Sequence, residues 1–351
     1  MQRFFNLLFL IVIPSIGACQ ECLKEEADAI YKQALTANHN AKYDSSIYYF
    51  KKSSEQYYSI EDWENYINAE IGIGWVLATK GQYENSLEHL HITLDKSIRR
   101  LTEKHVSTAS CYNNIGIAYD YKGNYANAVE FYKKSLSIKK DILGSQNKLV
   151  ARDINNIGVT YAMVGNYKQA LLYFNQSLHI RLSVNDKSLK DIADSYNNIG
   201  ELFNISGQLD SSAMYLNKSI KILEEELGKY HPEISKGYAN IADLFVKTAK
   251  YDSAMIYYNE AEERLIHTFG MKHPYLSSVY RKISRAYKTE ELFDMSSNYA
   301  HRAAVTLIRD VENIDIYAFL ELKGIISNID FLHSLINKGN ILFSKWCYVN
   351  K

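Results

Sequence analysis

The chain has 351 residues, of which 47% are hydrophobic and 23% are charged, a composition typical of a soluble folded protein and not of a disordered one. Its 40 Lys and Arg residues balance its 40 Asp and Glu residues, so no overall field attracts nucleic acid or anionic membranes. Only three prolines accompany 29 tyrosines, which predicts packed helices. We therefore expect a mostly helical protein whose partners are selected by local surface chemistry.

The first 18 residues have the architecture of a secretory signal peptide. Arg3 precedes an apolar run of about a dozen residues, and small residues follow. The run is too short to span a membrane comfortably. Its end, Ile16-Gly17-Ala18-Cys19, resembles the bacterial lipoprotein box, which implies that Cys19 is lipidated and begins the mature chain. Ordinary cleavage after Ala18 is the alternative, and both place the protein in the bacterial periplasm or at the outer membrane.

The remaining cysteines give no sign of a metal or cofactor site. Cys19 and Cys22 have the spacing of a redox or zinc pair, but neither a second pair nor a helical histidine partner accompanies them. Cys111 and Cys347 are too distant in sequence for a disulfide to be inferred. We expect neither a metal nor a cofactor.

An internal repeat dominates the middle of the chain. "YNNIGIAYDYKGNYANAVEFY" begins at Tyr112, and related stretches begin at Ile154 and Tyr196, each 42 residues further on. The expected turn positions are Gly81, Gly123, Gly165, Gly207, Ala249 and Glu291. A large residue follows at Tyr83, Tyr125, Tyr167, Leu209, Tyr251 and Phe293, and a small one at Ser86, Ala128, Ala170, Ser212, Ala254 and Ser296. Each unit therefore predicts two closely packed helices joined by a tight turn.

The repeat resembles the tetratricopeptide repeat (TPR) family across residues 24–303. One unit matches the family pattern at Tyr112, Ile115, Gly116, Tyr119, Ala128 and Tyr132, with Ser135 in place of the last Ala. The period exceeds the family's usual 34 or so residues by about two helical turns, as in kinesin light chains and their bacterial relatives. The resemblance implies an all-α fold, a right-handed superhelical α-solenoid of about seven antiparallel helix pairs within residues 19–303. It also predicts that Gly116, Gly158 and Gly200 lie where helices pack, with Ala242 and Ser284 replacing that glycine in the last two pairs.

Two turns between repeats carry a His-Pro pair, in "GKYHP" (228–232) and "GMKHP" (270–274). Proline suits the first turn of a helix, where an N–H has no intrahelical partner. We therefore interpret His231 and His273 as turn residues and not as functional histidines.

The sequence contains no recognisable catalytic constellation. His89 and His91 are two residues apart, which points their rings to different sides of a helix. The glycines of the repeat lack the strand, loop and helix context of a phosphate loop. We expect no enzymatic activity, and the TPR resemblance implies a scaffold that binds a protein or peptide on its concave wall.

Residues 304–351 leave the repeat register and predict a C-terminal helical cap, with apolar spacing at Ile325, Ile329, Leu332, Leu335 and Ile336. This segment resembles the one that joins exported bacterial TPR arrays to a caspase-like CHAT peptidase domain. Because Cys347 lies close to the end of the sequence, we expect no catalytic loop around it. The alternative function is therefore the sensing half of a CHAT-type peptidase or envelope signalling system whose effector domain is lost or lies on another chain.

The resemblance also suggests where a partner binds, because the fifth, ninth and twelfth positions of each first helix face the groove in the TPR family. The fifth positions carry Asn113, Asn155 and Asn197, whose amides can hold a peptide backbone or, alternatively, bond to the neighbouring repeat. The last repeat adds Arg281, Arg285 and Lys288 on one helix face, which favours an acidic peptide or a C-terminal carboxylate. A solvated basic face, partly neutralised by Asp243, is the alternative there.

Overall fold

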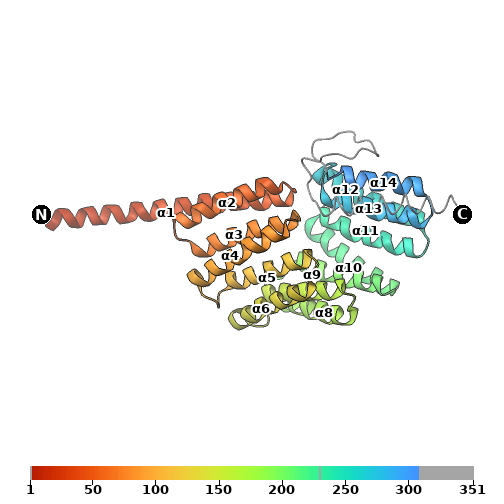
Figure 1. The fold of residues 1–351 in the computed structure, drawn as a ribbon, viewed down its shortest axis with the longest axis horizontal. Coiled ribbons are helices and arrows are strands. Elements are labelled where there is room, and N and C mark those ends of the chain that lie inside the picture. The colour runs from red at the N-terminus through yellow and green to blue at the C-terminus, as the bar shows by residue number, and fades with distance from the viewer. Residues whose placement is uncertain (1, 229–230, 308–351) are drawn as a thin grey trace. The chain divides into compact units, whose positions relative to one another are not determined.

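The computed structural model describes residues 2–228 and 231–307, and within them every regular element is a helix, as predicted (Figure 1). The helices in chain order are α1 (Gln2–His39), α2 (Tyr43–Ser59), α3 (Trp63–Thr79), α4 (Tyr83–Leu101), α5 (Val106–Tyr121), α6 (Tyr125–Leu143), α7 (Lys148–Met163), α8 (Tyr167–Ser183), α9 (Leu189–Ile205), α10 (Leu209–Leu227), α11 (Pro232–Lys247), α12 (Tyr251–Phe269), α13 (Pro274–Thr289) and α14 (Phe293–Val305). They give the seven helix pairs that the repeat predicts.

The chain divides into two compact units, residues 1–138 and 139–351. In the N-terminal unit α1 packs on α2 and α3 on α4, and each helix also contacts the next along the chain up to α5 (Figure 1). In the C-terminal unit the pairs are α7 with α8, α9 with α10, α11 with α12, and α13 with α14. The first helices of these pairs, α7, α9, α11 and α13, also contact one another in that order. We call this row of four helices the first-helix wall.

Tight turns join the two helices of each pair and explain why glycine recurs every 42 residues at the turn positions. At Gly123 φ is +81°, the Gly123 N–H donates to Asp120 O at 2.9 Å, and the Asn124 N–H donates to Tyr119 O at 2.8 Å. These two bonds satisfy carbonyls that the helix end leaves open. Ala249 (φ 55°) and Glu291 (φ 64°) adopt the same left-handed conformation at the positions where the predicted step lacks glycine. The turn prediction is therefore confirmed at all six positions.

Polar side chains cap the N-termini of the helices that follow the turns between repeats. The Nδ1 atom of His231 accepts the Glu233 N–H at 3.3 Å, and that of His273 accepts the Tyr275 N–H at 3.2 Å. Each histidine precedes a proline at the first position of its helix. Both histidines are therefore turn residues, as predicted, and their rings serve as helix N-caps.

Close packing between paired helices explains the second glycine series. A Cβ atom on Gly158 would lie 2.8 Å from the Phe174 ring, and one on Gly116 would lie 2.7 Å from Tyr132. The small residues after the turns face the same contact, where Ser212 Oγ donates to Gly200 O at 2.7 Å. The predicted packing role of Gly116, Gly158 and Gly200 is confirmed.

Helix α1 begins at Gln2 and continues through the predicted signal residues to His39. Cleavage and lipidation at Cys19 stay predictions. None of the described helices is both long and apolar enough to cross a membrane. The predicted cap from residue 304 onward, including Ile325, Ile329, Leu332, Leu335, Ile336 and Cys347, lies outside the described residues except for 304–307.

Candidate functional site

A cleft of about 510 Å³ lies on the first-helix wall of the C-terminal unit. Three first helices supply most of its polar side chains: Lys190, Asp194, Asn197 and Glu201 from α9, Glu233, Ser235, Lys236 and Asn240 from α11, and Tyr275, Ser278 and Lys282 from α13. Leu223 of α10 and Leu265 of α12 also line it, and both are almost fully buried. The cleft therefore combines a charged rim with an apolar floor.

Helix periodicity and the repeat together gather these residues. Lys190, Asp194, Asn197 and Glu201 follow one another at steps of four, three and four, which places them on one face of α9. Asp194, Lys236 and Ser278 are separated by the repeat step of 42 residues. Since α9, α11 and α13 contact one another in order, residues at one repeat position come to lie side by side.

Amide side chains link the helices of this wall. Asn198 Nδ2 donates to Asn155 Oδ1 at 3.1 Å, and Asn240 Nδ2 donates to Asn197 Oδ1 at 3.0 Å. Lys282 Nζ continues the row by donating to Asn240 Oδ1 at 3.0 Å. Asn155 and Asn197 thus bond to the neighbouring repeat. This was the alternative to a peptide-binding role for the asparagines at the fifth positions.

Ion pairs cross the cleft between α9, α11 and α13. Lys190 Nζ lies 2.5 Å from Glu233 Oε1, and Lys236 Nζ lies 4.0 Å from Glu201 Oε1. Lys282 forms an ion pair with Asp243. Burial alone would raise the pKa of the Glu201 carboxyl, but Lys236, Lys282 and the Asn240 amide together hold that pKa below its usual value.

Four polar groups in the cleft depart from this pattern of pairing. Asp194 makes no hydrogen bond or ion pair with any described residue, and burial raises the pKa of its carboxyl. Asn197 Nδ2, Ser235 Oγ and Glu233 Oε2 are buried atoms that have no hydrogen-bond partner within the described part of the chain. Because buried polar atoms in folded proteins are nearly always hydrogen-bonded, these groups mark the cleft as a candidate binding site.

The residues predicted to line the groove occupy different environments. Asn113 is buried in α5 of the N-terminal unit, Asn155 is half-buried in α7, and Asn197 lines the cleft. Arg281 Nη1 donates to Ser277 Oγ at 3.4 Å, Arg285 is exposed, and Lys288 is half-buried.

The three basic residues, Arg281, Arg285 and Lys288, lie on α13 but are not part of the cleft lining, and a role for them in binding stays a prediction. Lys282, which the sequence analysis missed, is the α13 cation that lines the cleft. The repeat step from Asn198 through Asn240 to Lys282 was the signal that could have identified it.

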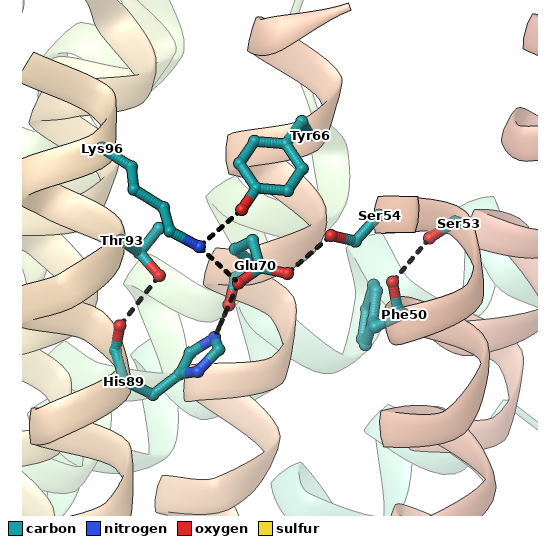
Figure 2. Close-up of polar contacts among 8 residues, drawn as sticks. All are labelled: Phe50, Ser53, Ser54, Tyr66, Glu70, His89, Thr93 and Lys96. Atoms are coloured by element: carbon teal, nitrogen blue, oxygen red, sulfur yellow. Dashed lines mark hydrogen bonds and ion pairs between the residues drawn. The ribbon is translucent and has the colours of Figure 1, made fainter. Parts of the chain in front are cut away.

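A second polar cluster lies in the N-terminal unit, where α2, α3 and α4 meet (Figure 2). Ser54 Oγ donates to Glu70 Oε1 at 2.5 Å, and Lys96 Nζ donates to the Tyr66 hydroxyl at 2.6 Å. His89 Nε2 lies 3.0 Å from the backbone oxygen of Glu70 and 3.5 Å from Oε2 of the same residue. All these charged groups have partners within the cluster, which therefore joins three helices.

This cluster occupies repeat positions that hold an aromatic pair in the next repeat. Glu70 and His89 stand one repeat step before Tyr112 and Phe131, whose rings pack against each other in the next pair. The His91 ring instead contacts Phe131, so the two histidines face different neighbours, as their spacing predicts. Across the described residues, no group of three or more His, Cys, Asp or Glu side chains is arranged to hold a metal ion.

The sequence profile of a family described as "Tetratricopeptide repeat" matches residues 76–141, 122–183 and 191–267, which together make up more than half of the chain. No curated protein sequence matches the chain significantly.

Three solved structures share the fold at low sequence identity. Aspartyl phosphate phosphatase F from Bacillus subtilis is 14% identical with a TM-score of 0.60, and the match covers 88% of this chain and 77% of that one. The apo form of RapI is 15% identical with a TM-score of 0.57, and the match covers 80% of this chain and 97% of that one. BtubC (BKLC) from P. vanneervenii is 16% identical with a TM-score of 0.52, and the match covers 69% of this chain and 93% of that one. At these identities the similarity establishes the fold alone.

Proposed function

The chain belongs to the tetratricopeptide repeat family, and from this premise we propose that it is an exported, non-enzymatic scaffold that holds a partner protein or peptide against its first-helix wall. Stacked helix pairs expose an extended wall of first helices on which a partner chain can lie. The observation that carries the proposal is the cleft between α9, α11 and α13, with its charged rim and buried polar atoms that lack partners.

A variant that fills the cleft tests the proposal without depending on the charge of the partner. Ser278 is half-buried in α13 and lines the cleft, so Ser278→Trp should occupy the space that a partner needs. Ser253→Trp is the matched control, because Ser253 is half-buried in α12, a second helix. Tagged full-length proteins would be used to capture partners from envelope extracts, with circular dichroism to verify folding.

We expect the wild-type protein and Ser253→Trp to capture the same partner, and Ser278→Trp to lose it while retaining its helicity. If a folded Ser278→Trp protein captured that partner as well as the wild type does, binding to this wall would be excluded.

The export part of the proposal rests on the amino-terminal sequence. Arg3, the apolar run and Ile16-Gly17-Ala18-Cys19 together have the order of a lipoprotein signal. Cys19→Ser should shift the protein from the membrane fraction to the soluble fraction, because stable anchoring needs more than one acyl chain and those chains attach at Cys19. Cys22→Ser is the control and should stay in membranes. An unlipidated mature wild-type terminus, measured by mass spectrometry, would rule out the anchor.

A further inference from the structure

The cleft pairs each of its lysines with an acid. Lys190 contacts Glu233 at 2.5 Å, Lys236 contacts Glu201 at 4.0 Å, and Lys282 pairs with Asp243. Asp194 is the remaining acidic residue of the lining, and it makes no ion pair among the described residues. The lining holds three lysines and three acids, so Asp194 is left without an ion pair because Lys282 pairs with Asp243, which lies outside the lining.

The surroundings of Asp194 compensate its charge only in part. Burial raises the pKa of the carboxyl, and the attraction of Lys236, Lys190 and Arg181 opposes this effect without reversing it. Glu233 lies close enough to raise the pKa further. The carboxylate thus loses part of its hydration, and the nearby cations attract it without forming an ion pair among the described residues. A cation placed directly beside it would stabilise the ionised form.

Independent evidence for a bound group comes from buried atoms without partners. Ser235 is 1% exposed and lines the cleft with an Oγ atom that has no hydrogen-bond partner in the described residues. Glu233 uses Oε1 for Lys190, whereas its Oε2 atom has no hydrogen-bond partner there. A carboxylate oxygen accepts only, so Glu233 Oε2 can take a donor that the described residues do not supply.

The apolar floor indicates the shape of that donor. Leu223, Leu265 and Val279 are each less than 5% exposed and line the same cleft. Tyr275 is 54% exposed at the cleft and offers an aromatic ring. Long basic side chains bury their methylene stems on such surfaces while the charged head contacts carboxylates or an aromatic ring.

We infer that the cleft binds a lysine or arginine side chain of the partner, with Asp194 and Glu233 Oε2 accepting hydrogen bonds from its charged head. The inference rests on the proposed scaffold function and specifies the chemistry of its partner. It differs from the expectation of an acidic partner, which came from Arg281, Arg285 and Lys288 on α13. A partner that satisfies both would carry a basic side chain for the cleft and acidic groups for α13.

Short peptides with blocked ends test this assignment on the full-length protein. The probe is acetyl-Ala-Arg-Ala-amide, with the corresponding lysine peptide as second probe and a citrulline peptide as the neutral isostere. Isothermal calorimetry should show binding of at least one basic peptide, and about tenfold or more weaker binding of citrulline, since charge-assisted hydrogen bonds are about twice as strong as neutral ones. Asp194→Asn should weaken the basic peptide to a similar extent.

Asp210→Asn is the matched control, because Asp210 is an exposed acid in the first turn of α10. It should bind the basic peptide as the wild type does, and thermal melting verifies that both variants fold. Equal binding of citrulline, unchanged binding by Asp194→Asn, or no binding of either basic peptide would each overturn the inference. If Asp194→Asn still captured the partner that Ser278→Trp loses, the inference would fail and the scaffold function would stand.

Discussion

Lys139 of α6 and Asp153 of α7 form an ion pair in which both side chains are completely buried, with 2.7 Å between Nζ and Oδ1. Burial lowers the pKa of Lys139 to about 8, although the Asp153 carboxylate acts in the opposite direction. Removal of both charges from water is therefore only partly offset by their attraction. Such a pair tolerates the loss of both partners better than the loss of one.

We predict that Lys139→Met alone and Asp153→Leu alone each destabilise the protein by about 3–5 kcal/mol, because each leaves a buried charge without its partner. The double variant Lys139→Met with Asp153→Leu should be much closer to the wild type, since it leaves no buried charge. Urea denaturation of the four proteins gives the coupling energy. Additive effects of the two single substitutions would contradict the interpretation.

The polar cluster in Figure 2 predicts a loss of stability in mild acid. Burial lowers the pKa of His89 below its usual value, despite the attraction of Glu70. The unfolded chain therefore binds a proton at His89 more readily than the folded protein does. The contribution of His89 is present above the unfolded pKa of about 6.5 and is lost as pH falls below it toward the folded value.

We expect the melting temperature to fall between pH 7.5 and pH 5, and His89→Gln to reduce that fall. His179→Gln is the control, because His179 is exposed on α8. An equal decrease for wild type and His89→Gln would show that other groups are responsible.

The repeat was predictable because one spacing controls both packing and turns. A step of 42 residues identified the left-handed turns even at Ala249 and Glu291, where a search for glycine alone would have failed. Gly158 was assigned to a helix contact on the same basis, and a Cβ there would indeed lie 2.8 Å from Phe174. Local spacing suffices for these features, because each pair repeats the same contacts.

The cleft was less predictable, because adjacent helix positions differ in direction by about 100°. Arg281 and Lys282 are neighbours in sequence, but Lys282 lines the cleft whereas Arg281 bonds Ser277. The importance of Asp194 depends on which lysines are already paired, and these ion pairs join residues of three different helices. The spacing of residues along the sequence does not show which of them form these ion pairs.

The contact at Gly158 can be tested by coupled substitutions. Gly158→Ala should destabilise the protein by about 1–3 kcal/mol, because the new methyl group overlaps the Phe174 ring. Phe174→Leu alone should also destabilise it, through a cavity. The double variant should lose less than the sum of the two, since the smaller side chain makes room for the methyl group. Strict additivity in urea denaturation would show that Phe174 does not limit this contact.

The last prediction concerns the basic residues of α13. Lys282 pairs with Asp243 and donates to Asn240, whereas the sequence predicts that Arg281 and the exposed Arg285 meet acidic groups of a partner. Arg281→Ala with Arg285→Ala should weaken binding of the captured partner and reduce its dependence on salt, because exposed charge contacts are screened by ions. Helicity and melting should change little, since neither side chain is in the core.

The matched control is Lys168→Ala with Lys221→Ala, which removes two exposed lysines from the second helices α8 and α10. Calorimetry at two salt concentrations should separate the two double variants, with the control retaining both the affinity and the salt dependence of the wild type. Equal affinity of all three proteins would place the acidic contacts elsewhere.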